Sequence, residues 1–292
     1  MPDPKTGPRP TQPLAPGLYI IATPIGNLRD ITLRALDLLA EVDEVLAEDT
    51  RVARRLLDAH GIRAKLSPYH DHNGAQRRPS LIQRIQQGEA LALISDAGTP
   101  LVSDPGWKLV SEAIDAGCEI FPVPGASSAL AGLVGSGLPS DRFLFQGFLP
   151  QKAGARRANL KQLAAIPVTQ IFFESTTRLG ARLEEFADVF GPDRHAVVAR
   201  ELTKLFEEFR RGTLVELVEH YRKAGPPKGE VVILIGPPAQ SQTVTESDID
   251  AALRSAMASQ PLKTAAAEVA ESLGLPRRDI YQRALALKDA ES

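Results

Sequence analysis

The chain has little that could cross-link it or hold it in a lipid bilayer. It contains one cysteine, Cys118, which excludes a disulfide framework and a cluster of thiolate metal ligands. No apolar run approaches the roughly 18–20 residues of a membrane span. The N-terminal residues lack the apolar stretch of a secretory signal. We therefore expect a cytoplasmic protein that does not enter a membrane.

An excess of positive charge is also missing. The 34 Lys and Arg residues are outnumbered by 36 Asp and Glu, which gives a net charge of −2. Proteins that bind naked nucleic acid by releasing counterions usually carry a clear positive excess. Any nucleic-acid contact would have to use local clusters, each of which could equally be a solvated helix face. The candidate clusters are Arg51, Arg54 and Arg55; Arg77 and Arg78; and Lys152, Arg156, Arg157 and Lys161.

Strand-like and helix-like segments alternate from Gly17 onward. Near-continuous apolar strands between amphipathic helices predict a parallel sheet with helices on both faces, here a domain over 17–136. The predicted strands are 18–23, 44–49, one within 64–73, 90–95 and 119–123; the predicted helices are 31–41, 51–61, 80–88 (after Pro79), 107–117 and 124–137.

The pattern restarts after the Gly-Leu-Pro sequence at 137–139. Strands are predicted at 143–148, 169–175, 195–201 and 230–236, with helices at 179–191 and 215–225 among the intervening segments. The fold class is thus α/β, with a second α/β domain over 137–238 in series with the first. Residues 1–16, which include six prolines, are predicted to form a disordered tail.

A polar linker leads to a different C-terminal segment, 245–292. Two helices around the Gly-Leu-Pro turn at 274–276 predict a helix-turn-helix-like domain. Its six basic and eight acidic residues give a net charge of −2. Both a nucleic-acid contact and a stabilising or docking module remain open. The predicted core is Ala266, Val269, Ala270, Leu273, Ile280, Tyr281, Ala284 and Leu285.

Polar stretches follow every predicted strand of the first domain. They read TPIGN (23–27), EDTR (48–51), YHDHN (69–73), SDAGTPLVSDPG (95–106) and PGASS (124–128). Ligands of open parallel sheets bind beyond the carboxyl ends of the strands. These stretches therefore predict a ligand cleft at that edge, where Asp96 can accept hydrogen bonds from hydroxyl or amine groups.

Several common ligand and nucleophile motifs are absent. There is no GxGxxG after the first strand and no GxxxxGK[ST], so dinucleotide and P-loop functions lose support. His70, Asp71 and His72 have no companion motif for a metal, and Ser127 lies outside a GxSxG turn. The residues alone predict an α/β enzyme with a ligand cleft between two domains.

Eight blocks in one order take the interpretation further: TPIGNLRDITLRAL, AEDTR, HDHN, SDAGTPLVSDPG, LPSDRFLFQGFLP, FFESTTRL, ARELTK and KGE. Together they resemble the RsmI family of ribosomal small-subunit methyltransferases, within the tetrapyrrole-methylase superfamily. The resemblance spans about Gly17–Pro238, and the C-terminal helices resemble a small domain that many members carry. This chain has Ser95-Asp96-Ala97 at the position where much of the superfamily has Gly-Asp-Pro. The difference argues against a porphyrinoid substrate.

The resemblance implies 2′-O-methylation of a cytidine ribose in the decoding region of 16S rRNA, on the small ribosomal subunit. It implies S-adenosylmethionine as the donor, bound folded between the two domains, and a homodimer. Because this sulfonium donor is already activated, we expect the chemistry to need no metal. The 96–102 loop would hold the ribose and methionine parts, and Phe173, Ala199, Leu202 and 228–229 would close over the adenine. The implied cofactor contacts are Pro24, Asp96, Gly98, Thr99, Pro100, Leu101, Val102, Ser127, Ser128, Phe173, Ala199, Leu202, Lys228 and Gly229.

A ribose hydroxyl is a weak acid, so a nearby base would help as the new bond forms. Asp49 and Glu201 are the candidate bases, with Arg51 and Lys204 as charge partners or phosphate clamps. Each pair could equally be a structural ion pair at the domain seam. Two other functions stay open: a tetrapyrrole precursor methylase, and a helix-turn-helix regulator that senses S-adenosylmethionine.

Overall fold

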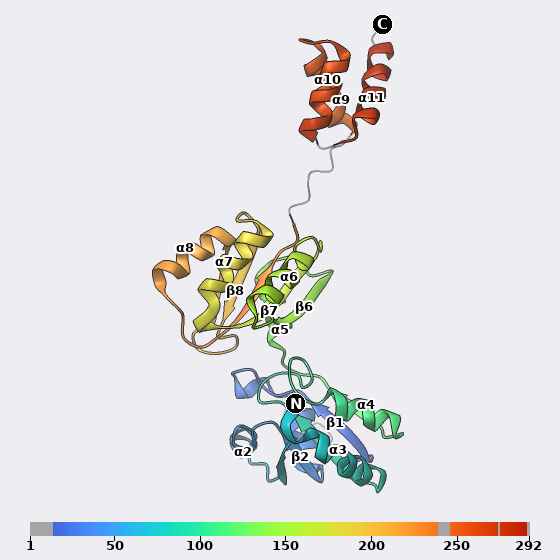
Figure 1. Cartoon of the computed structure of the whole chain (residues 1–292). Helices are drawn as coiled ribbons and strands as arrows, with labels where there is room; N and C mark the ends of the chain where they lie inside the picture. The colour runs from blue at the N-terminus through green and yellow to red at the C-terminus, as the bar shows by residue number, and fades with distance from the viewer. Residues whose placement is uncertain (1–13, 239–245, 274, 291–292) are drawn as a thin grey trace, which may run out of the picture. The chain divides into compact units, whose positions relative to one another are not determined.

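The computed structural model describes residues 14–238, 246–273 and 275–290 (Figure 1). The chain divides into two compact units, residues 1–238 and 239–292. The predicted tail falls almost wholly outside the described residues, and so does most of the predicted linker. None of the helices in the described ranges is both long and apolar enough to cross a membrane.

The first unit begins with a five-stranded sheet in the order β3-β2-β4-β1-β5, in which every neighbouring pair is parallel. All five residues of β4 are buried, which explains its continuous run of apolar side chains. The predicted parallel sheet is confirmed. Its strands are β1 (Gly17–Ile21), β2 (Glu44–Ala47), β3 (Leu66–Pro68), β4 (Ala90–Ile94) and β5 (Ile120–Val123).

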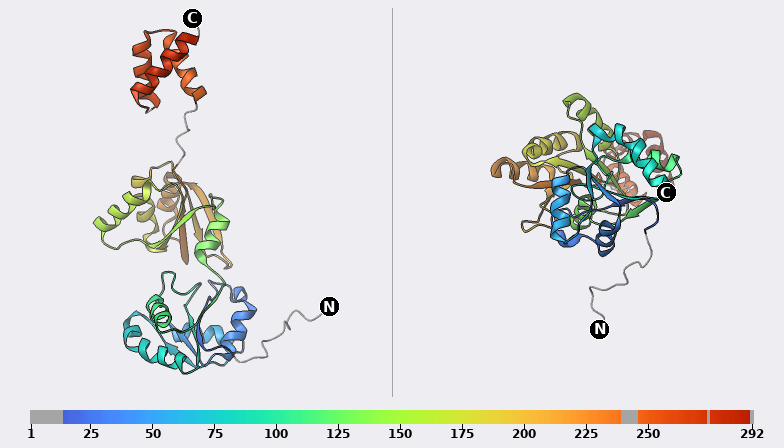
Figure 2. Two further views of the ribbon diagram at one scale, coloured as in Figure 1. Left: turned by 90° about the vertical axis from the view of Figure 1, so that its right-hand side faces the viewer. Right: turned by 90° about the horizontal axis from the view of Figure 1, so that it is seen from below.

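Side chains alternate between two cores, one on each face of this sheet. Tyr19 and Ile21 of β1 belong to one core, and Leu18 belongs to the other. The first core is closed by α1 and α2 and the second by α3 and α4, so helices cover both faces (Figures 1 and 2). The helices are α1 (Leu33–Glu41), α2 (Thr50–Ala59), α3 (Asp71–Gln86) and α4 (Trp107–Asp115); a short 3-10 helix, η1 (Leu28–Asp30), precedes α1.

Helix α3 begins earlier than predicted. The sequence placed its start after Pro79, but the helix begins at Asp71 and contains Pro79 in its interior. The Asn73 side chain accepts the backbone N–H of His70 at 3.0 Å, which caps the new start. Tertiary contacts of Leu81 and Ile85 bury the far half of the helix. The HDHN block is therefore a helix start rather than a loop.

The second sheet is mixed, in the order β6-β7-β10-β8-β9. Only the β6–β7 pair is parallel, and the other three pairs are antiparallel. The edge strand β9 is absent from the sequence prediction because its residues, EFRRGT, are mostly polar. The strands are β6 (Phe143–Phe148), β7 (Thr169–Ser175), β8 (His195–Arg200), β9 (Glu208–Thr213) and β10 (Glu230–Ile235).

Helices cover both faces of the second sheet as well. One face packs against α6, α7 and α8 around Phe172 and Phe186. The other face packs against α5, whose Gly132 lies beside Val232 and Leu234. Although α5 follows β5 in the chain, it therefore packs on the second sheet; the domain borders predicted from sequence remain predictions. The helices are α5 (Ser128–Ser136), α6 (Ala153–Ala164), η2 (Thr176–Arg178), α7 (Leu179–Phe190) and α8 (Leu214–Ala224).

The second unit is a small helical domain with its own core. The described residues form α9 (Glu246–Met257), α10 (Leu262–Leu273) and α11 (Arg277–Ala290). The sequence predicted two helices and missed α9, which begins inside the supposed polar linker. The core contains Leu253 and Leu287 besides most of the predicted residues, but Tyr281 and Leu285 are about 40% exposed and were wrongly placed there.

Candidate functional site

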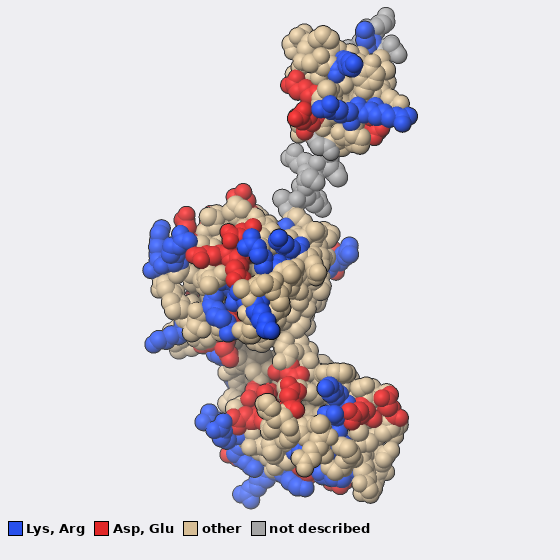
Figure 3. Space-filling view, in the orientation of Figure 1, with Lys and Arg blue, Asp and Glu red and all other residues tan. Residues whose placement is uncertain are grey.

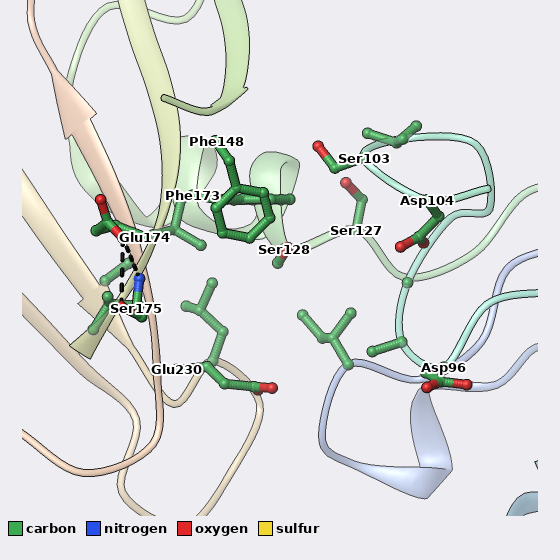
Figure 4. A pocket seen from close by; sticks show the side chains of 18 of the residues that line it. Asp96, Ser103, Asp104, Ser127, Ser128, Phe148, Phe173, Glu174, Ser175 and Glu230 are labelled. Atoms are coloured by element: carbon green, nitrogen blue, oxygen red, sulfur yellow. Dashed lines mark hydrogen bonds between the residues drawn. The ribbon is translucent and has the colours of Figure 1, made fainter. Parts of the chain in front are cut away.

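A cavity of about 460 Å³ lies within the first unit, between the carboxyl edge of the first sheet and the second sheet (Figure 4). The first sheet contributes the loop after β4, Ile25 and the start of α5. The second contributes the ends of β6, β7 and β8 and the start of β10. The lining residues are Ile25, Asp96, Ala97, Gly98, Thr99, Val102, Ser103, Asp104, Ser127, Ser128, Phe148, Phe173, Glu174, Ser175, Thr176, Ala199, Leu202, Gly229, Glu230, Val231 and Val232.

The loop after β4 is tied back onto the end of β1. Thr23 and Gly98 exchange two backbone hydrogen bonds of 2.8 and 3.0 Å, and the buried Ser95 hydroxyl donates to the Gly98 carbonyl at 3.1 Å. Leu101 and Ser103 have φ values of 71° and 67°, a region that costs energy for residues other than glycine. The turn chemistry of SDAGTPLVSDPG thus builds one wall of the cavity and turns the loop toward the second sheet.

Ten of the fourteen predicted cofactor contacts line this cavity. Pro24, Pro100, Leu101 and Lys228 do not, although each is adjacent in sequence to a residue that does. The cavity therefore brings together most of the predicted set, and the role of these residues remains a prediction. The ten are Asp96, Gly98, Thr99, Val102, Ser127, Ser128, Phe173, Ala199, Leu202 and Gly229.

Eleven lining residues were not in the predicted set. Most come from blocks that the sequence had already singled out, such as SDAGTPLVSDPG, LPSDRFLFQGFLP and FFESTTRL. Phe148 and Phe173 form an edge-to-face pair with ring centroids 5.6 Å apart. The eleven are Ile25, Ala97, Ser103, Asp104, Phe148, Glu174, Ser175, Thr176, Glu230, Val231 and Val232.

Among the described residues, four carboxylates line the cavity, and they differ in their partners. Glu174 is paired with Arg178 at 2.8 Å and with Arg182 at 2.7 Å. Burial alone would raise the pKa of Glu174, but hydrogen bonds from Ser175 and the two arginines outweigh it and lower that pKa. Glu230 pairs with Lys204 at 2.7 Å.

The other two carboxylates, Asp96 and Asp104, lie on the loop after β4. Asp96 accepts the backbone N–H of Asp49 at 3.0 Å. Burial raises the pKa of Asp104 to about 6, and the negative charges of Glu48 and Asp96 act in the same direction; the nearby Ser95 side chain opposes them in part. Asp104 thus differs from Glu174 and Glu230 in having no cation paired with it among the described residues.

The four predicted catalytic residues lie outside the cavity lining. Asp49 caps α2 and pairs with Arg51 at 2.6 Å. Hydrogen bonds from the Arg51 side chain and backbone hold the pKa of Asp49 at about 2. Glu201 pairs with Lys204 at 2.9 Å, and that hydrogen bond lowers the pKa of Glu201. The sequence left open whether each pair is a structural ion pair, and both ion pairs are present in the structure. The catalytic role of these residues stays a prediction.

A second, smaller cavity of about 310 Å³ lies beside the first residues of α3 and α4, where Tyr69, His70, Arg78, Trp107 and Lys108 line it. His70 and His72 contact each other edge to face, with ring centroids 5.9 Å apart. Within the described residues, no three His, Cys, Asp or Glu side chains are grouped so that they could hold a metal ion.

The two sheets with a cavity between them match a known class. Residues 17–218 match the family Tetrapyrrole (Corrin/Porphyrin) Methylases, and residues 243–288 match the RsmI C-terminal HTH domain. A similar solved structure is uroporphyrin-III C-methyltransferase from Thermus thermophilus, complexed with S-adenyl homocysteine. It has a TM-score of 0.54 and 19% identity, covering 75% of this chain and 97% of that one. At this identity the likeness shows the fold alone.

Relatives of much higher identity narrow the class. Ribosomal RNA small subunit methyltransferase I of Mesorhizobium japonicum is 53% identical over 280 residues, which are 96% of this chain and 95% of the relative. The protein of the same name from Escherichia coli O157:H7 is 45% identical over 92% of this chain and 94% of its own length. The chain belongs to the RsmI family of methyltransferases, a branch of the tetrapyrrole methylases.

Proposed function

We propose that this chain transfers a methyl group from S-adenosylmethionine to a cytidine ribose 2′-oxygen in the decoding region of 16S rRNA, within the small ribosomal subunit. The observation that carries the proposal is the identity of 45–53% with small-subunit methyltransferases over more than nine-tenths of the chain. The paired α/β sheets and the HTH match over 243–288 agree with this family.

The cavity fits the chemistry of such a donor. Its volume of about 460 Å³ falls within the usual range for small-molecule sites. Phe173, Ala199 and Leu202 offer an apolar surface for an adenine ring. Asp96, together with Ser127 and Ser128, offers polar groups for ribose hydroxyls and an amino-acid head. Once bound, the donor supplies an activated methyl group, so the protein must chiefly align the ribose oxygen with it, which is worth about 7–11 kcal/mol at best.

The charge distribution supports an assembled particle as the substrate. Lys and Arg side chains are interspersed with Asp and Glu on the face shown in Figure 3. Such a surface would bind naked RNA weakly, so shape and local contacts would have to select the site. We further propose that the enzyme acts in the cytoplasm as a homodimer, and sedimentation equilibrium should then give about twice the 31.5 kDa mass of the chain.

Methyl transfer from labelled S-adenosylmethionine tests the proposal directly. Three acceptors are compared side by side: unmodified small ribosomal subunits, naked 16S rRNA and a tetrapyrrole precursor. We expect label on a ribose 2′-oxygen of the subunits, with little on naked rRNA. The modified nucleoside is identified by nuclease digestion and mass spectrometry, because a 2′-O-methyl group survives digestion as part of the nucleoside.

The other outcomes identify the competing functions. Label on the tetrapyrrole would show that the substrate is a tetrapyrrole and not RNA, and it would leave the fold and the proposed donor unchanged. Tight, sequence-specific DNA binding without any transfer would favour a regulator that senses S-adenosylmethionine. Transfer to naked rRNA alone would overturn the assembled subunit as the substrate.

A further inference from the structure

Of the four carboxylates that line the large cavity in the described chain, Asp104 is the one without a competing strong partner. Glu174 is held by two arginines, which lower its pKa and make it a weak proton acceptor, and the Glu230 carboxylate is paired with Lys204 at 2.7 Å. Asp96 accepts the Asp49 backbone N–H at 3.0 Å, which occupies one of its oxygens. This comparison singles out Asp104 among the cavity carboxylates.

The position of Asp104 suits a group that meets the substrate. Its carboxylate lies on the loop side of the cavity, together with Ser127 and Asp96, and across from Phe173 and Glu230 (Figure 4). The loop that carries it is anchored on both sides: Gly98 exchanges two backbone hydrogen bonds with Thr23, and Gly106 is buried against Leu93. Such anchoring helps to hold a side chain in one place relative to the cavity.

The surroundings of Asp104 favour its protonated form at mildly acidic pH. Burial is the main cause, and the charges that act on it are both negative: Glu48, which follows β2, and Asp96 on its own loop. The nearby Ser95 side chain partly offsets these effects. With a pKa of about 6, Asp104 is mostly ionised at pH 7–8 yet basic enough to take a proton.

We propose that Asp104 is the catalytic residue that accepts the proton of the ribose 2′-hydroxyl during methyl transfer. This proposal rests on the proposed function. As the new oxygen–carbon bond forms, the hydroxyl proton passes to a carboxylate oxygen of Asp104. The bond between sulfur and the methyl carbon breaks, and its electron pair stays on sulfur, which becomes a neutral thioether.

The test uses full-length enzyme and single-turnover methyl transfer to unmodified small subunits between pH 5 and pH 9. For the wild type we expect the rate to rise with pH, with an apparent pKa near 6, and then to level off. Asp104→Asn should lower the plateau about 100-fold or more, in line with the usual contribution of a general base, and should remove the rise. Asp104→Glu should keep the rise and recover part of the rate.

Two further variants make the comparison specific. Asp193→Asn makes the same substitution at an exposed aspartate in the turn before β8. Its single-turnover rate and pH profile should equal those of the wild type. Asp49→Asn tests one of the two bases predicted from the sequence, and we expect it to cost much less than Asp104→Asn. A rate within threefold of wild type for Asp104→Asn would overturn the proposal, and a large loss for Asp49→Asn would then favour Asp49 as the base.

Two measurements do not depend on turnover. Titration of 13C-labelled aspartate carboxyls by NMR, assigned by the signal lost in Asp104→Asn, should give Asp104 an apparent pKa near 6; a value below about 4.5 would contradict the proposal. Calorimetric binding of S-adenosylhomocysteine should agree within threefold between wild type and Asp104→Asn. A tenfold weaker affinity would make Asp104 a cofactor contact instead. If wild-type enzyme transfers no methyl group, the proposed function fails, and this proposal fails with it.

Discussion

The Asp104 side chain illustrates how a single residue can oppose the stability of the fold that holds it. Its folded-state pKa of about 6 lies above the ordinary value of 3.8, so folding favours the protonated form. A tenfold change in an acid's dissociation constant corresponds to about 1.4 kcal/mol. The cost to folding is therefore absent well below pH 4, grows as the pH rises from 4 to 6, and is complete above 6.

Replacing the carboxyl by an amide should remove this cost. We expect Asp104→Asn to raise the free energy of unfolding by about 1–2 kcal/mol at pH 7.5, after allowance for partial solvent screening, and by only about 0.3 kcal/mol at pH 4. Urea unfolding followed by tryptophan fluorescence measures this free energy, because the single tryptophan, Trp107, lies in the same unit as Asp104. Asp193→Asn should change stability at neither pH. A stability loss for Asp104→Asn at pH 7.5 would show that the carboxylate is stabilised by a partner.

At the scale of secondary-structure elements, the sequence predicted the buried strands well. It did not predict the elements that depend on tertiary packing. The buried strands β1, β4 and β10 have nearly continuous apolar runs, and β7 has an apolar centre; all four were predicted within a residue or two. Strand β9 was missed because four of its six residues are polar, and helix α9 was missed because half of its residues are polar and it begins inside the predicted linker. Pro79 was taken as a helix start, although tertiary packing carries α3 through it.

The same limit explains the outcome for the site. The chain order places polar loops after strands, so the sequence could predict the cleft and most of its wall. It also named Arg51 and Lys204 as possible charge partners of Asp49 and Glu201, and both ion pairs are present in the structure. It could not show that these four side chains lie outside the cavity lining, because spacing along the chain does not give the direction in which a side chain points. Asp104 was overlooked because it ends a turn that glycine and proline dominate.

Helix α11 offers the second test, at its exposed N-terminal end. Arg277 and Arg278 are exposed; Arg277 has one loose ion pair, with Glu271 at 3.6 Å. A row of Lys and Arg side chains is visible on the C-terminal unit in Figure 3. If this unit contacts rRNA, Arg277→Glu combined with Arg278→Glu should weaken binding to small subunits about tenfold or more at 100 mM salt and leave cofactor affinity unchanged.

A matched control makes this result interpretable. Arg222→Glu with Lys223→Glu changes the net charge equally at the exposed end of α8, so it should leave subunit affinity within about twofold. Glutamate near the start of α11 interacts favourably with the helix dipole, and the loose Arg277 pair contributes little, so the fold should survive the change. Filter binding across a salt series measures both variants. Unchanged affinity in the α11 variant would assign the C-terminal unit a docking or stabilising role.

At the scale of the whole molecule, the two units have separate cores of unequal size. Among the described residues of the C-terminal unit, the core cluster contains seven buried residues, three of them alanines, which come from α9, α10 and α11. The first unit has four cores on the faces of its two sheets. Small domains bury a smaller share of their surface on folding, so the C-terminal unit should be the less stable of the two.

Scanning calorimetry of the full chain should therefore show two transitions, the smaller at lower temperature. S-adenosylhomocysteine at 100 times its dissociation constant stabilises the unit that binds it by about 2.7 kcal/mol. For a domain of this size, that corresponds to a rise of about 5–10 °C in Tm. Because the large cavity is lined entirely by residues of the first unit, only the larger, later transition should move. If both transitions moved together, the units would unfold cooperatively; if neither moved, the large cavity would not be the cofactor site.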